Sequence, residues 1–163
     1  PLGSGFSWET DTRDCLLVAG GIGLAPMGFL AQRLLDEGKR VRLLFSPRRD
    51  AALLEALPFR ERLDVSCCEN RSALPAALDA LLAQGADAVF SCGPEGLLES
   101  VAERAAAHGV PCQLSMERRM ACGIGICLGC AIAIHTPGGV TYKKVCKDGP
   151  VFRGEEVAFH AQP

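Results

Sequence analysis

Short apolar runs alternate with longer segments of helical periodicity from the start of the chain to about Leu114. The runs have the length of buried strands, and the longer segments repeat apolar residues three and four positions apart, as on one face of a helix. Glycine or proline often stands where a run or a segment ends. The predicted strands are Cys15–Ala19, Val41–Phe45, Leu63–Cys67, Ala88–Cys92 and Val110–Leu114, and the predicted helices are about Ala25–Asp36, Ala73–Ala83 and Glu95–His108.

Five strands that alternate with helices predict an α/β fold, a five-stranded doubly wound parallel sheet with right-handed crossovers. We expect this sheet to form one domain over residues 15–115. In such sheets ligands bind beyond the carboxyl ends of the strands, so the turns that follow the strands are the first candidates for a site.

The turn after the first strand is rich in glycine, with Gly20, Gly21 and Gly23, and Pro26 follows in the first helical turn. Glycine lets a phosphate approach the backbone, and the helix N-terminus favours an anion. The turn departs from the usual dinucleotide fingerprint, because Pro26 occupies the third glycine position and Ser46, not an acidic residue, ends the second strand. A ligand loop and a plain tight turn both remain open.

A second glycine turn follows the fourth strand, where Cys92, Gly93 and Pro94 lie at the same predicted sheet edge. Two such turns would bracket one crevice. Cys92 is either a functional thiol or a small buried residue, and no His or Asp nearby in the sequence would make it a nucleophile.

Four cysteines after the predicted sheet are spaced C-x4-C-x2-C, with fifteen residues between the third and the fourth. This spacing is typical of four-thiolate ligation of a 2Fe-2S cluster and differs from the run in bacterial ferredoxins. Three glycines between the first three thiols allow the chain to curve tightly around a cluster. We expect Ile124, Ile126 and Leu128 to shield the cluster from water. The predicted ligands are Cys122, Cys127, Cys130 and Cys146.

Zinc binding, disulfide formation and simple burial are the alternative roles for cysteines in this chain. Structural zinc usually takes two C-x2-C pairs, and here only Cys127 and Cys130 have that spacing. A disulfide framework suits small secreted domains, whereas this chain has nine cysteines and a length that supports its own core. Burial as unpaired core residues accounts for four other cysteines but not for a glycine-punctuated cluster. These four are Cys15, Cys67, Cys68 and Cys112.

The C-terminal residues 116–163 are predicted to form a small module around the cysteines. Ala131–His135 and Val140–Lys144 alternate around a Thr-Pro-Gly-Gly turn, which predicts a β-hairpin. The hairpin would return Cys146 to the side of Cys130.

Composition limits the classes of function. A formal charge of −2 with mixed acidic and basic residues gives no reason to expect nucleic acid or an anionic membrane surface as a partner. No apolar run reaches the length of a membrane span. Many cysteines without secretory features favour a reducing, cytoplasmic location.

The two glycine turns resemble those in the pyridine-nucleotide domain of the ferredoxin reductase superfamily. Two further segments make the resemblance more specific than the superfamily: the cysteine segment from Met116 to Cys130 and the segment from Tyr142 to Phe152. Together they resemble the electron-transfer subunits of class 1B, NAD-dependent dihydroorotate dehydrogenases, and the resemblance covers most of the chain.

The resemblance implies a role for each matching residue. The first turn would hold the NAD pyrophosphate and the second would lie by the nicotinamide, while the four cysteines would ligate a 2Fe-2S cluster. In the family, the subunit relays electrons between NAD and the FMN of a catalytic partner subunit by way of FAD and the cluster, which carries them one at a time. The two subunits form a hetero-oligomer that oxidises dihydroorotate to orotate in pyrimidine (UMP) biosynthesis. The implied NAD site comprises Gly20, Gly21, Gly23, Pro26, Ser46, Cys92, Gly93 and Pro94, with Cys92 as the candidate catalytic residue.

Residues 1–14 depart from the family pattern, because the family places a flavin-binding β-barrel ahead of the sheet. These residues are expected to be a residual linker or the scar of a cleaved tag. The chain alone is then expected to hold FAD poorly and to lack full activity. Arg48 and Arg49 follow the second strand, where they either favour NADP or are solvated.

Two further functions remain open. One is a subunit of the sulfhydrogenase gamma type or of another flavin reductase. The second is a non-redox scaffold module that binds a structural metal.

Overall fold

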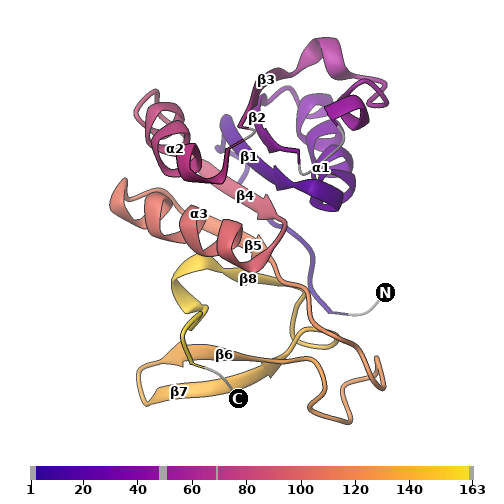
Figure 1. Cartoon of the computed structure of the whole chain (residues 1–163), viewed down its shortest axis with the longest axis vertical. Coiled ribbons are helices and arrows are strands. Elements are labelled where there is room, and N and C mark those ends of the chain that lie inside the picture. The colour runs from indigo at the N-terminus through magenta and orange to yellow at the C-terminus, as the bar shows by residue number, and fades with distance from the viewer. Residues whose placement is uncertain (1–2, 48–50, 69, 162–163) are drawn as a thin grey trace.

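The computed structural model describes residues 3–47, 51–68 and 70–161. Within them a six-stranded sheet runs in the order β3-β2-β1-β4-β5-β8, and β6 and β7 form a separate hairpin (Figure 1). The strands of the sheet are β1 (Asp14–Gly20), β2 (Arg40–Ser46), β3 (Asp64–Cys67), β4 (Ala88–Cys92), β5 (Cys112–Ser115) and β8 (Val151–Arg153). The α-helices are α1 (Leu24–Asp36), α2 (Leu74–Leu82) and α3 (Glu95–Ala107), and short 3-10 helices cover Gly21–Gly23, Ala51–Leu54, Arg60–Arg62, Arg71–Ala73 and Gly154–Glu156.

Strands β1 to β5 are parallel, as the alternation of strands and helices predicts. In the register, Gly20 at the end of β1 lies beside Ser46 at the end of β2. On the other side of β1, Ala19 pairs with Cys92 at the end of β4. The ends of β1, β2 and β4 therefore meet at one edge of the sheet, which brings the two glycine turns together.

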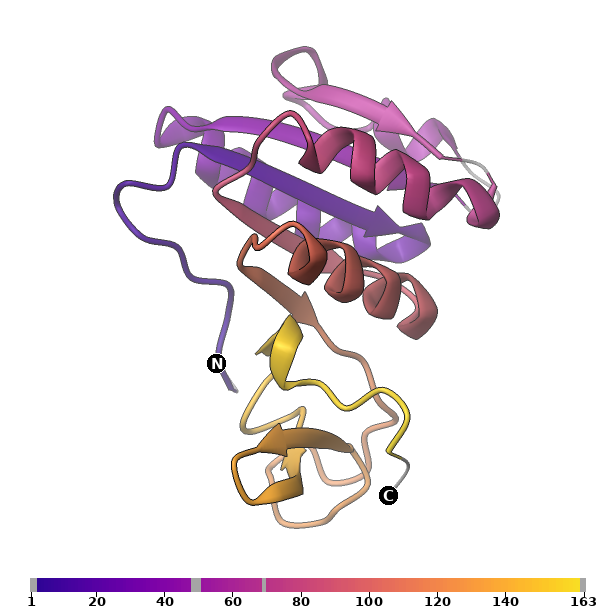
Figure 2. The same ribbon diagram turned by 90° about the vertical axis from the view of Figure 1, so that its left-hand side faces the viewer.

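Alternate residues of the central strands point to opposite faces of the sheet, and each face has its own apolar core. Leu17 packs on the α1 side with Met27, whereas Leu16 packs on the α2 and α3 side with Leu98. All four side chains are at most 1% exposed. Figure 2 shows the helices on both sides of the sheet, so the fold is doubly wound as predicted.

The sixth strand, β8, was not predicted. It comes from the C-terminal module and pairs antiparallel with β5, with Leu114 opposite Phe152. Three residues are too few to give a periodic pattern in the sequence, and the pairing is recognised only in three dimensions. The sheet is consequently mixed, and the C-terminal module is joined to its edge by backbone hydrogen bonds.

The predicted hairpin is confirmed as β6 (Ala131–Thr136) and β7 (Gly139–Lys144). Ile132 and Ile134 of β6 are 1% exposed and belong to the same apolar core as α2 and α3. The division of the chain at residue 115 stays a prediction, although this shared core packs the module firmly on the sheet.

An N-terminal strap, residues 3–12, crosses from the C-terminal module to the sheet. The Ser4 amide donates to the carbonyl of Gly149 at 2.6 Å, and Ser7 and Gln113 exchange two hydrogen bonds. Trp8 packs edge-on against Phe90 with ring centroids 6.4 Å apart. The described part of the predicted linker is thus ordered against both halves of the molecule.

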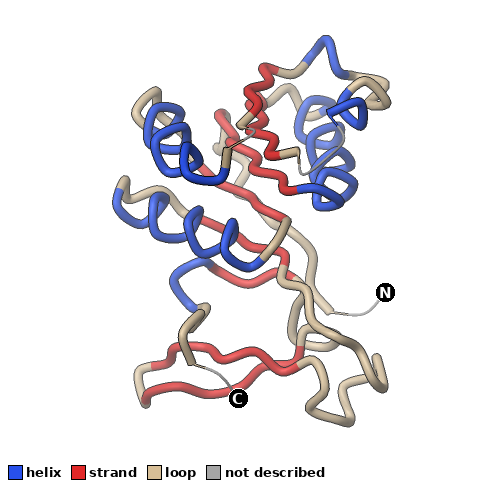
Figure 3. The backbone as a smooth tube through the Cα atoms, viewed as in Figure 1, coloured by secondary structure: helices blue, strands red, loops and turns tan. Residues whose placement is uncertain are grey.

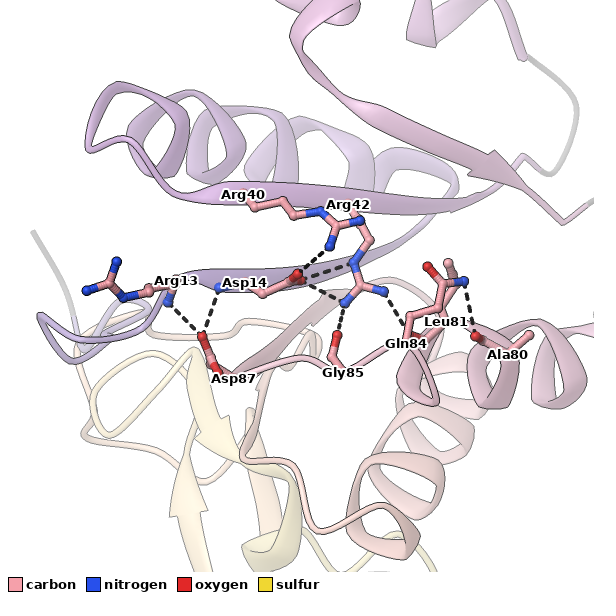
Figure 4. Close-up of polar contacts among 9 residues, drawn as sticks. All are labelled: Arg13, Asp14, Arg40, Arg42, Ala80, Leu81, Gln84, Gly85 and Asp87. Atoms are coloured by element: carbon pink, nitrogen blue, oxygen red, sulfur yellow. Dashed lines mark hydrogen bonds and ion pairs between the residues drawn. The ribbon is translucent and has the colours of Figure 1, made fainter.

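At the opposite, amino-terminal edge of the sheet, Arg42 is a charged residue that is only 1% exposed (Figure 4). Its guanidinium donates to Asp14 at 2.7 Å and to the carbonyl of Leu81 at 2.7 Å, and it also reaches the carbonyl of Gly85. These contacts tie the end of α2 to β1 and β2.

Candidate functional site

The two glycine turns at the carboxyl edge are packed backbone against backbone. A Cβ atom added to Gly23 would lie 2.1 Å from the carbonyl oxygen of Cys92. One added to Gly20 would lie 2.8 Å from the Pro94 ring, and one added to Gly93 would lie 3.0 Å from the Gly20 nitrogen. Glycine is therefore required at these positions by the contact between the turns themselves.

Gly21 differs from its neighbours. It has a φ of +53°, and the space around its missing side chain is open. Pro26 is exposed in the first turn of α1, as the sequence suggested, and Ile22 between the two is 83% exposed. Of the first turn, Gly21 and Pro26 lie where a ligand could reach them, whereas Gly20 and Gly23 are buried and shape the turn.

The half-buried thiol of Cys92 lies at the end of β4 beside Ser115, its partner in the register at the end of β5. Burial raises the pKa of the Cys92 thiol, and a hydrogen bond with the Ser115 side chain offsets part of that increase. The nearby carboxylate of Glu117 raises the pKa further. Cys92 is consequently a neutral thiol near pH 7, suited to contact a ligand rather than to attack it.

The four cysteines of the C-terminal module lie in two pairs. The Sγ atoms of Cys122 and Cys127 are 3.2 Å apart, and the Cys127 amide donates to the Cys122 sulfur at 3.4 Å. The Cys146 amide donates to the Cys130 sulfur at 3.5 Å. Within the described residues, no three His, Cys, Asp or Glu side chains converge as the ligands of a single metal ion would.

The hairpin is what returns the fourth cysteine to the third, as predicted. Val145, which follows β7, donates its amide to the carbonyl of Cys130 at 3.1 Å. Cys130 and Cys146 are 2% and 5% exposed and belong to the apolar core with Ile132 and Val145. One pair of thiols is thus enclosed, while Cys122 and Cys127 are only partly covered.

Backbone amides surround the partly covered pair because glycines curve the chain there. Gly123 and Gly125 have φ values of +67° and +80°, which other residues rarely adopt. Donation from the Cys127 and Ile124 amides lowers the pKa of the Cys122 thiol to about 6. Amides that stabilise a thiolate in this way also stabilise the sulfur ligands of a metal cluster.

The expected shielding by three apolar residues is wrong. Ile124, Ile126 and Leu128 are 62%, 79% and 70% exposed, and Met120 is also exposed. Gly123 and Gly125, which have positive φ values, curve the backbone here, and the three apolar side chains are left in contact with solvent. The cysteine loop, residues 117–130, therefore presents an apolar surface, in the segment drawn without helix or strand in Figure 3.

Several residues at this edge were not predicted from the sequence. Ser115 could have been found, since the ends of adjacent parallel strands must lie together. The ion pair between Arg118 and Glu95 joins the cysteine loop to the start of α3, and no spacing in the sequence indicates it. Arg48 and Arg49, named above for NADP preference, lie outside the described residues.

Comparison with known proteins agrees with this geometry. Residues 117–158 match the family described as the iron-sulfur cluster binding domain of dihydroorotate dehydrogenase B. The chain is 37% identical over 162 residues to the protein named dihydroorotate dehydrogenase B (NAD(+)), electron transfer subunit, from Caldanaerobacter subterraneus subsp. tengcongensis, covering 98% of this chain and 64% of the relative. The relative of the same name from Geobacillus kaustophilus is 38% identical over 165 residues, covering 96% and 63%.

Among solved structures, the chain is similar to an NADH-dependent reduced ferredoxin-NADP oxidoreductase, with a TM-score of 0.79, 28% identity and coverage of 98% of this chain and 58% of that one. A C-terminal hydrogenase domain from Pyrococcus furiosus, with a TM-score of 0.58, 21% identity and coverage of 71% of this chain and 100% of that one, shares the fold alone.

The sheet and the cysteine module together define a class of protein, a ferredoxin reductase-like α/β domain joined to a module that matches an iron-sulfur cluster binding domain. Residues 117–158 match the cluster-binding domain of dihydroorotate dehydrogenase B, and the chain as a whole is similar to proteins named as electron-transfer subunits of that enzyme. The chain spans less than two thirds of the length of these relatives. No helix within the described ranges is long and apolar enough to cross a membrane.

Proposed function

We propose that this chain is the nucleotide-binding and cluster-binding part of an electron-transfer subunit of dihydroorotate dehydrogenase B. It would relay electrons between NAD and the FMN of a catalytic subunit, by way of FAD and a 2Fe-2S cluster, in pyrimidine biosynthesis. The observation that carries this proposal is the match of residues 117–158 to a cluster-binding domain that contains all four paired cysteines.

The arrangement of the thiols fits a cluster with two irons. Cys122 and Cys127 would hold one iron, and Cys130 and Cys146 would hold the other. A bound 2Fe-2S cluster accepts and donates one electron at a time. The protein would contribute amide donors, such as those that Cys127 and Cys146 direct at neighbouring sulfurs, and these stabilise negative charge on the cluster. Two pairs fit this cluster better than a single zinc ion.

The carboxyl edge of the sheet would hold NAD. Gly21 and the N-terminus of α1, with Pro26, are accessible to a pyrophosphate, while the buried Gly20 and Gly23 keep the turn narrow. Ser46 lies beside Gly20, and its hydroxyl would bind a ribose hydroxyl. At the second turn, Cys92, Gly93 and Pro94 would border the nicotinamide, with the neutral Cys92 thiol in contact with the ring.

The partner would dock on the cysteine loop. Three large apolar side chains are exposed close to the proposed ligands: Ile124, Ile126 and Leu128. A cluster of exposed apolar side chains is typical of a surface that binds another protein. A catalytic subunit that covered them would exclude water from the cluster and shorten the electron path. The names of the homologues, which are electron-transfer subunits, support a catalytic partner.

Chemical analysis tests the cluster. Anaerobically purified protein should contain about two irons and two acid-labile sulfides per chain and should absorb visible light. Reduction with dithionite should give the electron paramagnetic resonance signal of one unpaired electron. A colourless protein that contains zinc, or a chain that cannot be loaded with iron and sulfide, would contradict the proposal and favour a scaffold.

Reconstitution tests the partner and the reaction. A subunit of the full length of the relatives, combined with an FMN-containing dihydroorotate dehydrogenase subunit, should oxidise dihydroorotate to orotate while NAD⁺ is reduced to NADH. An Ile126→Glu change should weaken the complex at least tenfold by burying a charge, and cluster content should stay unchanged. Phe29→Glu is the matched control, since Phe29 is 71% exposed on α1, outside the cysteine loop. Equal loss in both variants would argue against docking at this loop.

A further inference from the structure

The cysteine loop is joined to the second glycine turn by a two-bond ion pair. Arg118 Nη1 lies 2.6 Å from Glu95 Oε2, and Arg118 Nη2 lies 3.3 Å from Glu95 Oε1. We propose that Arg118 is a positioning residue that couples nucleotide binding at the Cys92–Pro94 turn to the retention of the cluster. The inference rests on the proposed function, because it assumes that NAD binds at that turn and that the cysteines hold a cluster.

Glu95 is fixed to the nucleotide side of the site. It is the first residue of α3 and directly follows Cys92, Gly93 and Pro94. A carboxylate at a helix N-terminus is favoured by the helix dipole, so the side chain is held near the turn. The amide of Leu97 donates to the carbonyl of Pro94 at 2.8 Å, which fixes the first turn of the helix behind it. A ligand that orders this turn therefore orders Glu95.

Arg118 belongs to the cluster side. It lies three residues after the end of β5 and four before Cys122. Residues 117–121 have no helix or strand, and among the described residues the ion pair with Glu95 is the one salt bridge that they make. Their neighbour Met116 is tied to Pro150 by a backbone hydrogen bond of 2.8 Å. The ion pair of Arg118 thus fixes the position of the segment that connects β5 to the first cysteine, Cys122.

The guanidinium of Arg118 suits this role because two parallel hydrogen bonds to a carboxylate fix direction as well as distance. A lysine would keep the charge but not the direction. The two side chains are 32% and 40% exposed, so the pair is only moderately strong. Its effect on nucleotide binding or on cluster retention is then a few-fold rather than a hundredfold. An effect of this size couples the two sites and still allows each to bind and release its ligand.

The test measures loss of iron from the cluster-loaded chain to a chelator, followed by visible absorbance, with and without saturating NAD⁺. In the native chain we expect NAD⁺ to slow iron release roughly threefold, within the range of a partly exposed ion pair. Arg118→Gln and Glu95→Gln should each abolish the effect of NAD⁺. The double variant should be no worse than either single one, and Arg118→Lys should restore only part of the effect.

Arg104 provides a matched control on the same helix. It pairs with Asp79 at 3.3 Å, and these side chains are 36% and 40% exposed, almost as in the Arg118–Glu95 pair. Arg104→Gln should leave the effect of NAD⁺ on iron release unchanged. If it abolishes the effect as Arg118→Gln does, the result reflects a general loss of stability and overturns the proposal.

Failure of the inference and failure of the proposed function give different results. A native chain that holds no iron, or that shows no binding of NAD⁺ by calorimetry, contradicts the proposed function. A native chain that holds both, but releases iron at the same rate with and without NAD⁺, overturns the coupling. So does an Arg118→Gln variant whose iron release responds to NAD⁺ as in the native chain. Should Arg118→Gln lose iron during purification, Glu95→Gln, which leaves the loop sequence intact, decides between these outcomes.

Discussion

The sheet and the cysteine loop are stabilised in different ways. In the central strand β1, every side chain from Cys15 to Ala19 is buried, and an apolar core lies on either face of the sheet. The cysteine loop, residues 117–130, has neither helix nor strand, and only Met116 before it and Cys130 at its end are deeply buried. The sheet is thus maintained by apolar burial, whereas the loop depends on glycine conformations, thiol pairs and a few polar ties.

Because of this difference, the global stability of the fold and the ability of the thiols to hold a cluster should depend on different residues. Apolar burial contributes to global stability, and a change there lowers the free energy of unfolding without altering the chemistry of the thiols. A change in the loop removes little buried area but alters the donor set of the cluster. Variants in one region should therefore leave the other region measurably intact.

The largest effect is expected from Cys127→Ser. Because a hydroxyl is a poor ligand for iron, bound iron should fall from about two per chain to nearly none. The sheet should survive, with far-ultraviolet circular dichroism like that of the native chain. Cys67→Ser is the control, because Cys67, which the sequence places in the core, is instead exposed at the end of β3, outside the loop. Loss of the circular dichroism signal along with the iron would mean that the two regions are not independent.

Arg42→Met should lower the stability of the sheet and leave the cysteine loop unchanged. It removes the buried guanidinium that donates to the partly buried Asp14 carboxylate and to the Leu81 carbonyl, and we expect unfolding to become easier by about 3 kcal/mol. Urea unfolding measures the cost, and iron content at zero urea should be unchanged.

Arg40 is a demanding control for this prediction. It pairs with the same Asp14 at 3.0 Å, but its side chain is 59% exposed. Arg40→Met should therefore cost less than about 1 kcal/mol. Equal costs for the two variants would show that charge, rather than burial, sets the stability of this edge.

Gly23→Ala tests the contact between the turns. The added methyl group would lie 2.1 Å from the Cys92 carbonyl oxygen. The two turns must move apart to make room for it, which should lower the free energy of unfolding by about 2 kcal/mol. NAD affinity, measured by calorimetry, should fall as well, while iron content should not. Gly5→Ala adds the same methyl group where nothing lies within 4 Å and should change neither property. Native stability in Gly23→Ala would contradict the close packing described above.

The contrast also explains what could be predicted from the sequence. Strands such as β1 and helices such as α1 follow from apolar periodicity, which is local, and the cluster ligands follow from cysteine spacing. The outward direction of Ile126 could not be predicted, because it depends on the backbone angles of the glycines beside it. Nor could the Arg118–Glu95 pair or β8, since each joins segments more than twenty residues apart.

The glycine turns illustrate the same limit more finely. The sequence correctly indicates two turns that meet at one sheet edge and leaves open whether the first is a ligand loop or a plain tight turn, whereas the family resemblance assigns all the glycines of the first turn to ligand binding. In the structure Gly20 and Gly23 are required by contact with Pro94 and Cys92, and only Gly21 has open space. A pattern of glycines predicts that something approaches closely, without distinguishing a ligand from a neighbouring turn.

The smallest effect concerns Asp87, next to β4. Its carboxylate accepts hydrogen bonds from the amides of Asp14 at 2.9 Å and Arg13 at 2.7 Å, and these lower the pKa of Asp87. A pKa that is lower in the folded state than its ordinary value of about 3.9 stabilises the fold above about pH 4. This contribution is lost as the pH falls through the folded-state pKa.

Asp87→Asn should therefore reduce stability at pH 7, by less than about 1 kcal/mol because the group is exposed. At pH 2 to 3 the difference from the native chain should shrink, and urea midpoints at both pH values measure it. Asp11→Asn removes the same charge from an exposed position in the strap, without the two amide donors, and should show a smaller difference at pH 7. A deficit in Asp87→Asn that is constant with pH would mean that the amide contacts stabilise the edge through geometry rather than through the carboxylate charge. The sheet would then be insensitive to titration at this edge, and its stability would come even more completely from the apolar cores.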